Sequence, residues 1–397
     1  MAAAPPGQPC KRCKVENAPY KLRNLATCRD CYVEHVVGKF RRSIGTMHKD
    51  IRASADLAPR RYLAGLSFGV SSTCLAQMLD DSARHHAAKQ SSSAFEPLIL
   101  HVDTDLTATI DDDTTPARRL LARYRQKYPH VSFDCVHLSR AVTLKTVDWS
   151  TLMPADQASA RVKDGDAGAS DADRLRRVFD ALPSVTSRAD VLRLLVRHIL
   201  IDAARTRGYD VVLLGHSTSA LAALTLAEVA NGRGFSVPGQ VGDGLQTVCA
   251  YDAAGNETSR SSFPVYYPLR EVLKNELVGY VDLIPALVEM KEEGLVDGLT
   301  SCGSQVVSHR DVSIEEVMQR YFDGVEGPYA GIVANVVRTA DKLDRAAGGA
   351  FCRLCGMTLD ESGDDRWAGD LGRDSGDSAA ANLKGKLCYG CRRSVSG

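Results

Sequence analysis

The sequence predicts an α/β fold, a doubly wound parallel sheet with a small cysteine-rich module at each end of the chain. Apolar strand-like runs alternate with amphipathic helical stretches from Tyr62 to Val281. This alternation is typical of a parallel sheet that helices cover on both faces. Eight of the twelve cysteines form four CxxC pairs, two near each end. In a doubly wound sheet, we expect any ligand site just beyond the carboxyl ends of the strands.

The predicted elements follow one another in a regular order. The predicted strands are Tyr62–Phe68, Pro97–Val102, Val131–Leu138 and Tyr209–Leu214, and the predicted helices are Thr73–Arg84, Ala117–Lys127, Ala189–Thr206 and Ala220–Ala230, with Leu269–Val281 continuing the alternation. Apolar residues at helical spacing support the helix over Ala189–Thr206 most strongly. Three stretches rich in Gly, Ser, Ala or Asp predict loops or disorder, namely Asp156–Asp173, Ala253–Ser262 and Asp360–Ala381.

Composition limits the class of protein. The chain has 397 residues, 44% of them hydrophobic and 25% charged, as in ordinary soluble proteins. No stretch approaches the roughly 20 apolar residues of a membrane span. The 49 basic and 49 acidic side chains cancel, so any nucleic-acid surface must arise from local asymmetry. The start, MAAAPPGQP, has no apolar signal region, and we therefore expect a cytoplasmic protein.

The two cysteine sets predict two zinc sites. The first set is Cys10, Cys13, Cys28 and Cys31, and the second is Cys352, Cys355, Cys388 and Cys391. Each CxxC turn presents two thiolates to one ion, and a second turn completes a tetrahedron. The second set has 32 residues between its pairs, which a long inserted loop explains at small entropic cost. Disulfides or redox pairs are the alternatives, and a cytoplasmic setting disfavours both.

A turn after the first predicted strand has the form of a phosphate-binding loop. Ser67, Gly69, Ser72 and Thr73 lie between that strand and an apolar helix, where free N–H groups and the helix dipole attract anions. The turn resembles the SGGxDS loop of ATP pyrophosphatases, but Phe68 replaces a glycine and Ser71 replaces the aspartate. Both changes oppose nucleotide binding. The alternative to a nucleotide-binding loop is a strand-to-helix turn that is retained only for the fold.

Further motifs carry a family resemblance over nearly the whole chain. In a known family of related proteins, the catalytic members read GHNADD at the place of Leu213–Ala220 (LLGHSTSA) in this chain. The same members carry a K-P-L/F-…-E-V segment to which Pro264–Val272 is similar. Together with the degenerate loop and the two zinc modules, these segments resemble the cytoplasmic tRNA 2-thiolation protein 2 family. This family is the non-catalytic partner of the enzyme that sulfurates wobble uridine. The resemblance implies an ATP pyrophosphatase fold, of the adenine nucleotide alpha hydrolase-like class.

The resemblance also locates what this chain lacks. Catalytic members carry a CxxC that falls here on Thr186 and Ala189, and neither is a cysteine. Sulfur transfer through a persulfide or an iron–sulfur cluster needs thiolates at that place. The remaining cysteines, Cys74, Cys135, Cys249 and Cys302, stand singly. The resemblance therefore implies a pseudo-enzyme, with no catalytic residue and no ATP on this chain.

The implied function is that of a supporting subunit in a heterodimeric tRNA thiolase. Such a complex makes the 2-thio group of the wobble uridine (mcm5s2U) in cytosolic tRNA Lys, Glu and Gln, with sulfur from a thiocarboxylated ubiquitin-like modifier. The implied partners are the catalytic thiouridylase paralogue, tRNA and that sulfur carrier. Basic residues beside the last zinc pair, Lys384, Lys386, Arg392 and Arg393, are the candidate tRNA contacts. The alternatives are an active ATP-dependent tRNA sulfurtransferase and a zinc-dependent protein-interaction scaffold.

These observations predict four parts of the chain. Residues 1–45 form an N-terminal zinc module, and residues 46–285 form the degenerate pyrophosphatase-like domain with a loop insertion over 154–187. A helical segment covers 286–348. Residues 349–397 form the C-terminal zinc module, with a disordered insertion over 360–381.

Overall fold

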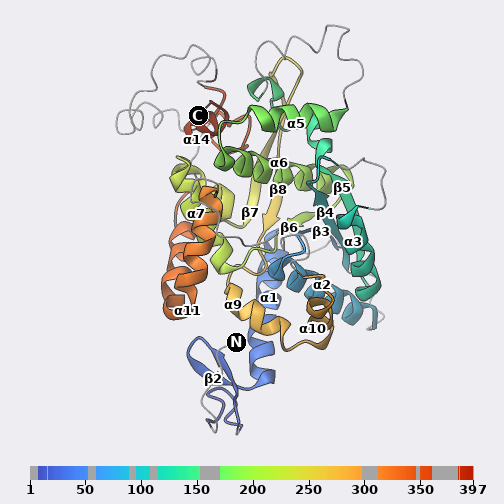
Figure 1. Ribbon diagram of the computed structural model, residues 1–397, viewed down its shortest axis with the longest axis vertical. Helices are drawn as coiled ribbons and strands as arrows, with labels where there is room; N and C mark the ends of the chain where they lie inside the picture. Colours follow the sequence, from blue (N-terminus) through green and yellow to red (C-terminus); the bar gives the residue numbers. More distant parts are fainter. Residues whose placement is uncertain are drawn as a thin grey trace.

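A six-stranded sheet forms the centre of the computed structural model (Figure 1). The structure describes residues 8–15, 17–51, 60–88, 95–107, 115–152, 170–296, 312–345, 349–359, 383 and 385–396. In spatial order the strands are β5 (Ser132–His137), β4 (Phe95–Asp103), β3 (Arg60–Leu66), β6 (Val211–Leu213), β8 (Glu257–Tyr266) and β7 (Gly244–Tyr251). Every neighbouring pair is parallel except β7 and β8, which are antiparallel. The predicted α/β class with a mostly parallel sheet is confirmed.

Helices cover both faces of this sheet. The helices are α1 (Arg29–Ile51), α2 (Val70–Ala88), α3 (Pro116–Lys127), α5 (Asp171–Ala181), α6 (Val185–Thr206), α7 (Thr218–Ala230), α8 (Val237–Val241), α9 (Lys274–Val281), α10 (Pro285–Glu292), α11 (Ile314–Asp341) and α14 (Tyr389–Ser396). Strand β3 shows how the chain serves two cores, because Tyr62, Ala64 and Leu66 join a cluster with α2 and α3, whereas Leu63 joins a cluster with α6 and α7. The sheet is therefore doubly wound, as predicted.

The order of the strands places a topological switch point between β3 and β6. From β3 the chain crosses to β4 and then β5 on one side, and it later returns to β6 on the other side of β3. The turns that follow β3 and β6 therefore diverge at one edge of the sheet. In open α/β sheets this crevice is where ligands bind.

Two predictions about loops were wrong where the structure describes the residues. The whole of Ala253–Ser262 was predicted to be a loop or disordered, but β8 begins at Glu257 and pairs with β7. Its polar first half is stabilised by ladder hydrogen bonds rather than by burial. Within the predicted insertion 154–187, α5 and the start of α6 are helical. A capping box between Ser170 and Asp173 starts α5. Residues 153–169 and 360–382 lie outside the described residues.

The helical segment predicted between the sheet and the last cysteine set is present as α10 and α11, while residues 297–311 lie outside the described part. Helix α11 packs along α7 (Figure 1). It bends at Pro328 because proline cannot donate an i to i−4 bond, and Tyr329 has non-helical angles of φ −131° and ψ 47°. None of the described helices is both long and apolar enough to cross a membrane.

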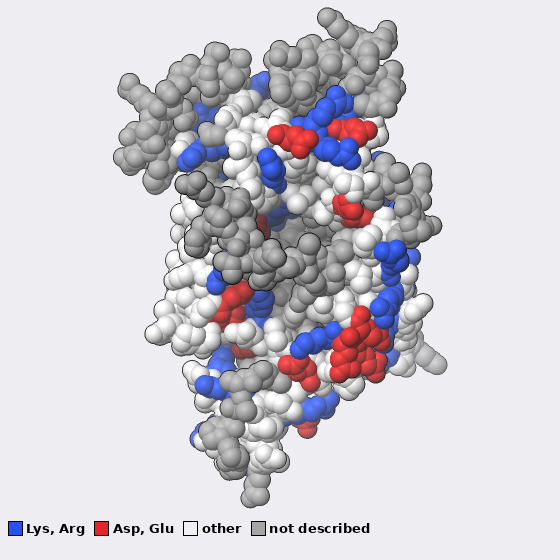
Figure 2. Space-filling model, in the orientation of Figure 1, with Lys and Arg blue, Asp and Glu red and all other residues white. Residues whose placement is uncertain are grey.

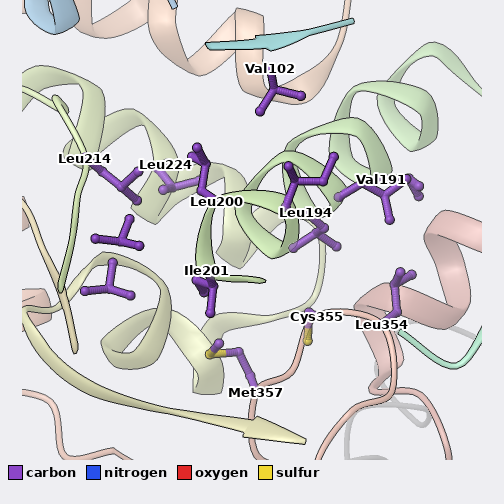
Figure 3. Close-up of a cluster of buried hydrophobic side chains, with 14 of the residues drawn as sticks. Val102, Val191, Leu194, Leu200, Ile201, Leu214, Leu224, Leu354, Cys355 and Met357 are labelled. Atoms are coloured by element: carbon purple, nitrogen blue, oxygen red, sulfur yellow. The ribbon is translucent and has the colours of Figure 1, made fainter. Parts of the chain in front are cut away.

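The two cysteine modules lie at opposite ends of the molecule (Figure 1). The N-terminal module is a hairpin of β1 (Tyr20–Leu22) and β2 (Leu25–Thr27) with its own small cluster of buried residues. The C-terminal module instead belongs to one of the two main cores. Figure 3 shows its Leu354, Cys355 and Met357 in the same cluster as Val191 and Ile201 of α6. The C-terminal module is thus built into the domain, and the N-terminal module is an appendage.

Candidate functional site

The turn after β3 brings the four predicted loop residues together, but they bond to the protein itself. Ser72 Oγ donates to Gly69 O at 3.1 Å and accepts from Ser67 N at 3.2 Å. The Thr73 hydroxyl lies 2.7 Å from the hydroxyl of Tyr124. Both Ser72 and Thr73 are buried. The hydroxyls that would face a phosphate are therefore committed to internal hydrogen bonds.

Phe68 keeps the left-handed backbone conformation of a glycine in this loop, but its ring fills the space that glycine would leave open. Its φ is +60°, a left-handed conformation that glycine adopts without strain and that costs other residues about 1–2 kcal/mol. The ring is fully buried and packs against His101 and Tyr124, with ring centroids at 4.4 Å and 5.2 Å. The turn thus keeps a geometry suited to glycine, and Phe68 serves the core.

The turn after β6 packs directly on this loop. A side chain at Gly215 would place its Cβ 3.0 Å from Ser72 Cα, so only glycine fits without a shift. His216 is half-buried, and its ring stands edge-on to Tyr267 at 5.4 Å. Burial and the positive charge of Arg197 lower the pKa of His216 to about 4. Within the described residues the ring makes no hydrogen bond and joins no group of metal ligands.

Three hydroxyl residues follow His216 where the catalytic members read Asn-Ala-Asp, and all three have structural roles. Ser217 caps α7 by accepting from Ala220 N at 3.2 Å. Thr218 Oγ1 donates to Arg270 O at 2.7 Å.

Ser219 is buried with a single carboxylate from α11. Its Oγ donates to Glu326 Oε2 at 2.6 Å and accepts from Lys274 N at 3.1 Å. Burial raises the pKa of Glu326, against the lowering effect of its hydrogen bonds from Ser219 and Asn275. Sequence reasoning missed Glu326, because this contact joins segments that are far apart in the chain.

The positions that align with the catalytic CxxC lie at the start of α6 and carry no thiol. Thr186 Oγ1 accepts from Ile314 N at 3.2 Å, which joins α6 to the start of α11. Ala189 is exposed. Of the single cysteines, Cys74 is fully buried, and burial raises its pKa. Burial likewise raises the pKa of Cys135 to about 11. Cys302 lies outside the described residues.

Both predicted cysteine sets assemble into four-thiol groups, in each of which the sulfurs lie within 4.8 Å of one another. A tetrahedral ion with Zn–S bonds of about 2.3 Å requires sulfurs about 3.8 Å apart. Cys13 and Cys28 Sγ are 3.5 Å apart, and Cys355 and Cys388 Sγ are 3.9 Å apart. In both groups one member of the second CxxC, Cys31 or Cys391, lies within a helix. The donor sets fit one metal ion each.

One thiol of each group, Cys10 or Cys352, has a lowered pKa, whereas burial and hydrogen bonds with the neighbouring thiols raise the pKa of Cys31 and Cys355. For Cys10, burial opposes ionisation, but hydrogen bonds from the backbone of Cys13, Cys28 and Arg12 lower its pKa to about 6. Cys388 N also donates to Cys352 Sγ at 3.3 Å. Such N–H···S bonds stabilise the ionised form that a metal binds.

A buried ion network holds the C-terminal module on α6. Arg233 is fully buried and donates to Asp190 Oδ2 at 2.9 Å and to Glu228 Oε2 at 2.8 Å. Asp190 also accepts from Ser394 of α14 at 2.7 Å. Burial raises the pKa of Asp190, but the charges of Arg233 and Arg193 outweigh burial and keep it below its ordinary value. This network was not predicted, since its members are distant in sequence.

The predicted tRNA contacts are placed only in part. Lys386 is half-buried and Arg393 is exposed on α14. The Arg392 guanidinium lies 5.9 Å from the ring of Tyr389, and Lys384 lies outside the described residues. Figure 2 shows acidic and basic side chains interspersed over one face of the molecule. The basic helix α3 is partly neutralised there, because Lys127 pairs with Glu293 of the chain following α10 at 3.0 Å.

Comparisons with known proteins point to one family. The family model described as cytoplasmic tRNA 2-thiolation protein 2 matches residues 313–393. The protein of that name from Phaeosphaeria nodorum is 34% identical over 396 residues, covering 97% of this chain and 94% of the relative. Its counterpart from Pyrenophora tritici-repentis is 30% identical over 395 residues, covering 98% and 94%.

Among solved structures, the chain is similar to the U34-tRNA thiolase NcsA from Methanococcus maripaludis, which was solved with its 4Fe-4S cluster. The TM-score is 0.51, and the match covers 92% of this chain and 97% of that one. With 13% sequence identity, this likeness shows a common fold.

Proposed function

Because the chain belongs to the cytoplasmic tRNA 2-thiolation protein 2 family, we propose that it is the supporting, non-catalytic subunit of a cytoplasmic tRNA thiolase. Its partner would be a catalytic paralogue with which it forms a heterodimer. The product would be the 2-thio group of the wobble uridine in tRNA Lys, Glu and Gln, with sulfur from a thiocarboxylated ubiquitin-like modifier.

One observation supports the non-catalytic assignment: the hydroxyl groups at the switch point form hydrogen bonds within the chain. Ser72, Thr73, Ser217, Thr218 and Ser219 all make hydrogen bonds within the chain. A phosphate cradle needs free N–H and hydroxyl groups and a cation-binding carboxylate. None of these five residues has a free hydroxyl, and the turn after β3 lacks the aspartate.

The remaining contribution of the chain would then be contact with its partners. The cysteine groups would each hold a structural zinc ion, whose binding energy stabilises the module around it. We propose that Lys384, Lys386, Arg392 and Arg393 contact tRNA phosphates beside the C-terminal site, because phosphate binding requires local positive charge.

The test has a cellular arm and a purified arm. Deletion of the chain should abolish 2-thiouridine, which is counted by slow migration of tRNA in a mercury-containing gel, and the wild-type chain should restore it. Ser72→Ala should also restore it, because this loop holds no substrate and the loss of one hydrogen bond costs about 1 kcal/mol. Reversing the charge of Lys386 and Arg393 should weaken tRNA binding, with a difference from wild type that shrinks as salt rises.

The purified chain should release no pyrophosphate from ATP above a control without enzyme. Turnover by this chain would instead favour an active sulfurtransferase. Normal thiolation in the deletion strain would contradict the proposed function altogether.

A further inference from the structure

A cavity of about 260 Å³ lies between the C-terminal metal module and the β7 edge of the sheet. Phe235, Leu245, Phe351 and Met357 give it apolar walls, and Gln246 is among the polar groups that line it. The residues come from α8 and the turn before it, from β7, from the segment after α11 and from the cysteine module, so four separate parts of the chain build one hollow. None of them belongs to the turns at the switch point.

The close packing around the cavity shows that its shape is determined by the fold. A Cβ at Gly239 would lie 2.6 Å from Met357 Sδ, so α8 approaches the cysteine module closely because this position has no side chain. Gly356 also lines the cavity, with a φ of +72°. This left-handed conformation turns the module's chain back toward Thr358. The cavity therefore depends on the C-terminal module being docked.

The guanidinium that lines the cavity belongs to the exposed Arg345, and a second guanidinium, that of Arg197, lines a neighbouring hollow. Arg345 donates to Asp243 O at 2.7 Å, a backbone oxygen. Arg197 lines a second hollow of about 20 Å³ that shares Gln246 with the first. Arg197 is 9% exposed, and its Nε has no hydrogen-bond partner. Its other partners are neutral, including the hydroxyl of Tyr267 at 2.8 Å.

Neither guanidinium forms an ion pair among the described residues, although burial, which lowers the pKa of Arg345, is opposed by the charge of Asp243, which raises it. Within the described ranges, neither Arg197 nor Arg345 has a carboxylate oxygen within 4.0 Å, the distance that defines an ion pair. Burial lowers the pKa of Arg345, and the charge of Arg197 lowers it further, which places the two cations in the same electrostatic environment. A buried cation that lacks a paired anion favours an anionic ligand.

We propose that this cavity binds one nucleotide, with the base against Phe235 and Phe351 and the phosphate at Arg345. Aromatic rings stack on any base, a guanidinium pairs with phosphate, and the amide of Gln246 offers polar atoms near the base edge. The volume lies below the roughly 300–1,000 Å³ of sites for drug-sized ligands, so a single nucleotide fits better than a larger ligand. We favour an unpaired nucleotide of tRNA, rather than a free nucleotide, as the ligand. This choice rests on the proposed function.

The first experiment measures affinity of the full, zinc-loaded chain for two probes, AMP and an anticodon stem-loop RNA. Phe351→Ala should lower RNA affinity about tenfold, since stacking contributes about 1–3 kcal/mol per base, and it should leave the salt dependence unchanged. Arg345→Gln should lower affinity and reduce the slope of log K against log salt by about one. Arg338→Gln is the matched control, because this exposed arginine of α11 lies outside the cavity.

Leu245→Glu provides a second test that does not depend on core packing. Leu245 is 61% exposed at the cavity, so the substitution should fold normally, as its melting temperature and zinc content will show. The added carboxylate should repel a phosphate and weaken both probes. A matching Leu343→Glu, at a residue of 50% exposure outside the cavity, should have a smaller effect.

The two probes distinguish the sources of the nucleotide. Weakened RNA binding together with competition by AMP supports the tRNA source, and weakened AMP binding alone supports a free nucleotide in the same cavity. Unchanged affinity for both probes in Phe351→Ala, Arg345→Gln and Leu245→Glu would overturn the inference. If deletion of the chain abolishes thiolation while these variants bind both probes normally, the cavity proposal fails and the proposed function stands.

Discussion

Glu276 of α9 is a buried carboxylate that joins the N-terminal module to the body of the protein, and its replacement should loosen that module. Its side chain is 5% exposed, and Oε1 accepts from Arg23 Nε at 2.5 Å and lies 3.3 Å from His35 Nε2. Lys39 Nζ is 3.9 Å from Oε2. Burial raises the pKa of Glu276, but His35, Lys39 and Arg23 together lower it from 4.5 to about 2.

The lowered pKa gives the magnitude and the pH dependence of the effect. A shift from 4.5 to about 2 corresponds to about 3 kcal/mol. Because Arg23 is 35% exposed, we expect Glu276→Gln to lower the free energy of unfolding by about 2 kcal/mol at pH 7. The folded pKa is the lower one, so this contribution is complete above pH 4.5 and is lost as the pH falls toward 2.

Urea unfolding of the zinc-loaded chain, followed from pH 7 to pH 3, measures this difference. Glu271→Gln is the matched control, since Glu271 is 59% exposed and lies 3.7 Å from Arg42, and it should change stability by less than about 1 kcal/mol. Limited proteolysis should release the N-terminal module faster from Glu276→Gln. Equal stability of the two variants at pH 7, or a difference that persists unchanged at pH 3, would refute the reasoning.

Three further predictions concern the core, the metal groups and the buried network. Phe68→Gly should lower the free energy of unfolding by about 2–3 kcal/mol, because the loss of a buried ring outweighs the relief of backbone strain. It should create no ATP turnover, and a stabilised variant would contradict the reasoning. Elemental analysis should find two zinc ions per chain, and Cys13→Ser and Cys388→Ser should each remove one. Cys388→Ser should lower the melting temperature more than Cys13→Ser does, because its site lies in the main core. Asp190→Asn should cost about 3 kcal/mol at pH 7, because it leaves buried Arg233 short of an anion, and an unchanged unfolding midpoint would exclude a structural role for the pair.

Periodicity and CxxC spacing were enough to predict the parallel strands β3, β4, β5 and β6 and the two metal groups, but not β8, which is parallel to β6. Both signals are local, since apolar runs indicate buried strands and cysteine spacing limits which thiols can meet. The antiparallel edge escaped prediction because Glu257–Arg260 is exposed and polar, so nothing in its pattern indicates a strand. Helix α5 could have been found, since Ser170 and Asp173 form a capping box just before Leu175 and Val178.

The partners of the switch-point residues could not be predicted, for a different reason. Ser219 meets Glu326 across 107 positions, and Thr218 meets Arg270 across 52. The sequence shows that Ser219 stands in place of an aspartate, but only the fold shows that both hydroxyls have an internal partner. The same holds for Arg197, which has no acidic partner among the described residues because neutral groups of α8, of β7 and of the residue after β8 meet around it.

The distribution of buried polar groups argues that ligand contact has moved away from the switch point. A site that binds a ligand keeps donors or charges without internal partners, since the ligand completes them. At the switch point, Ser72 and Ser219 are fully engaged within the chain. At the β7 edge, Arg197 keeps an unpartnered Nε and a charge without a paired acid. These hydroxyls at the switch point are thus engaged within the chain, whereas the buried guanidinium of Arg197 at the β7 edge keeps one nitrogen that a ligand would complete.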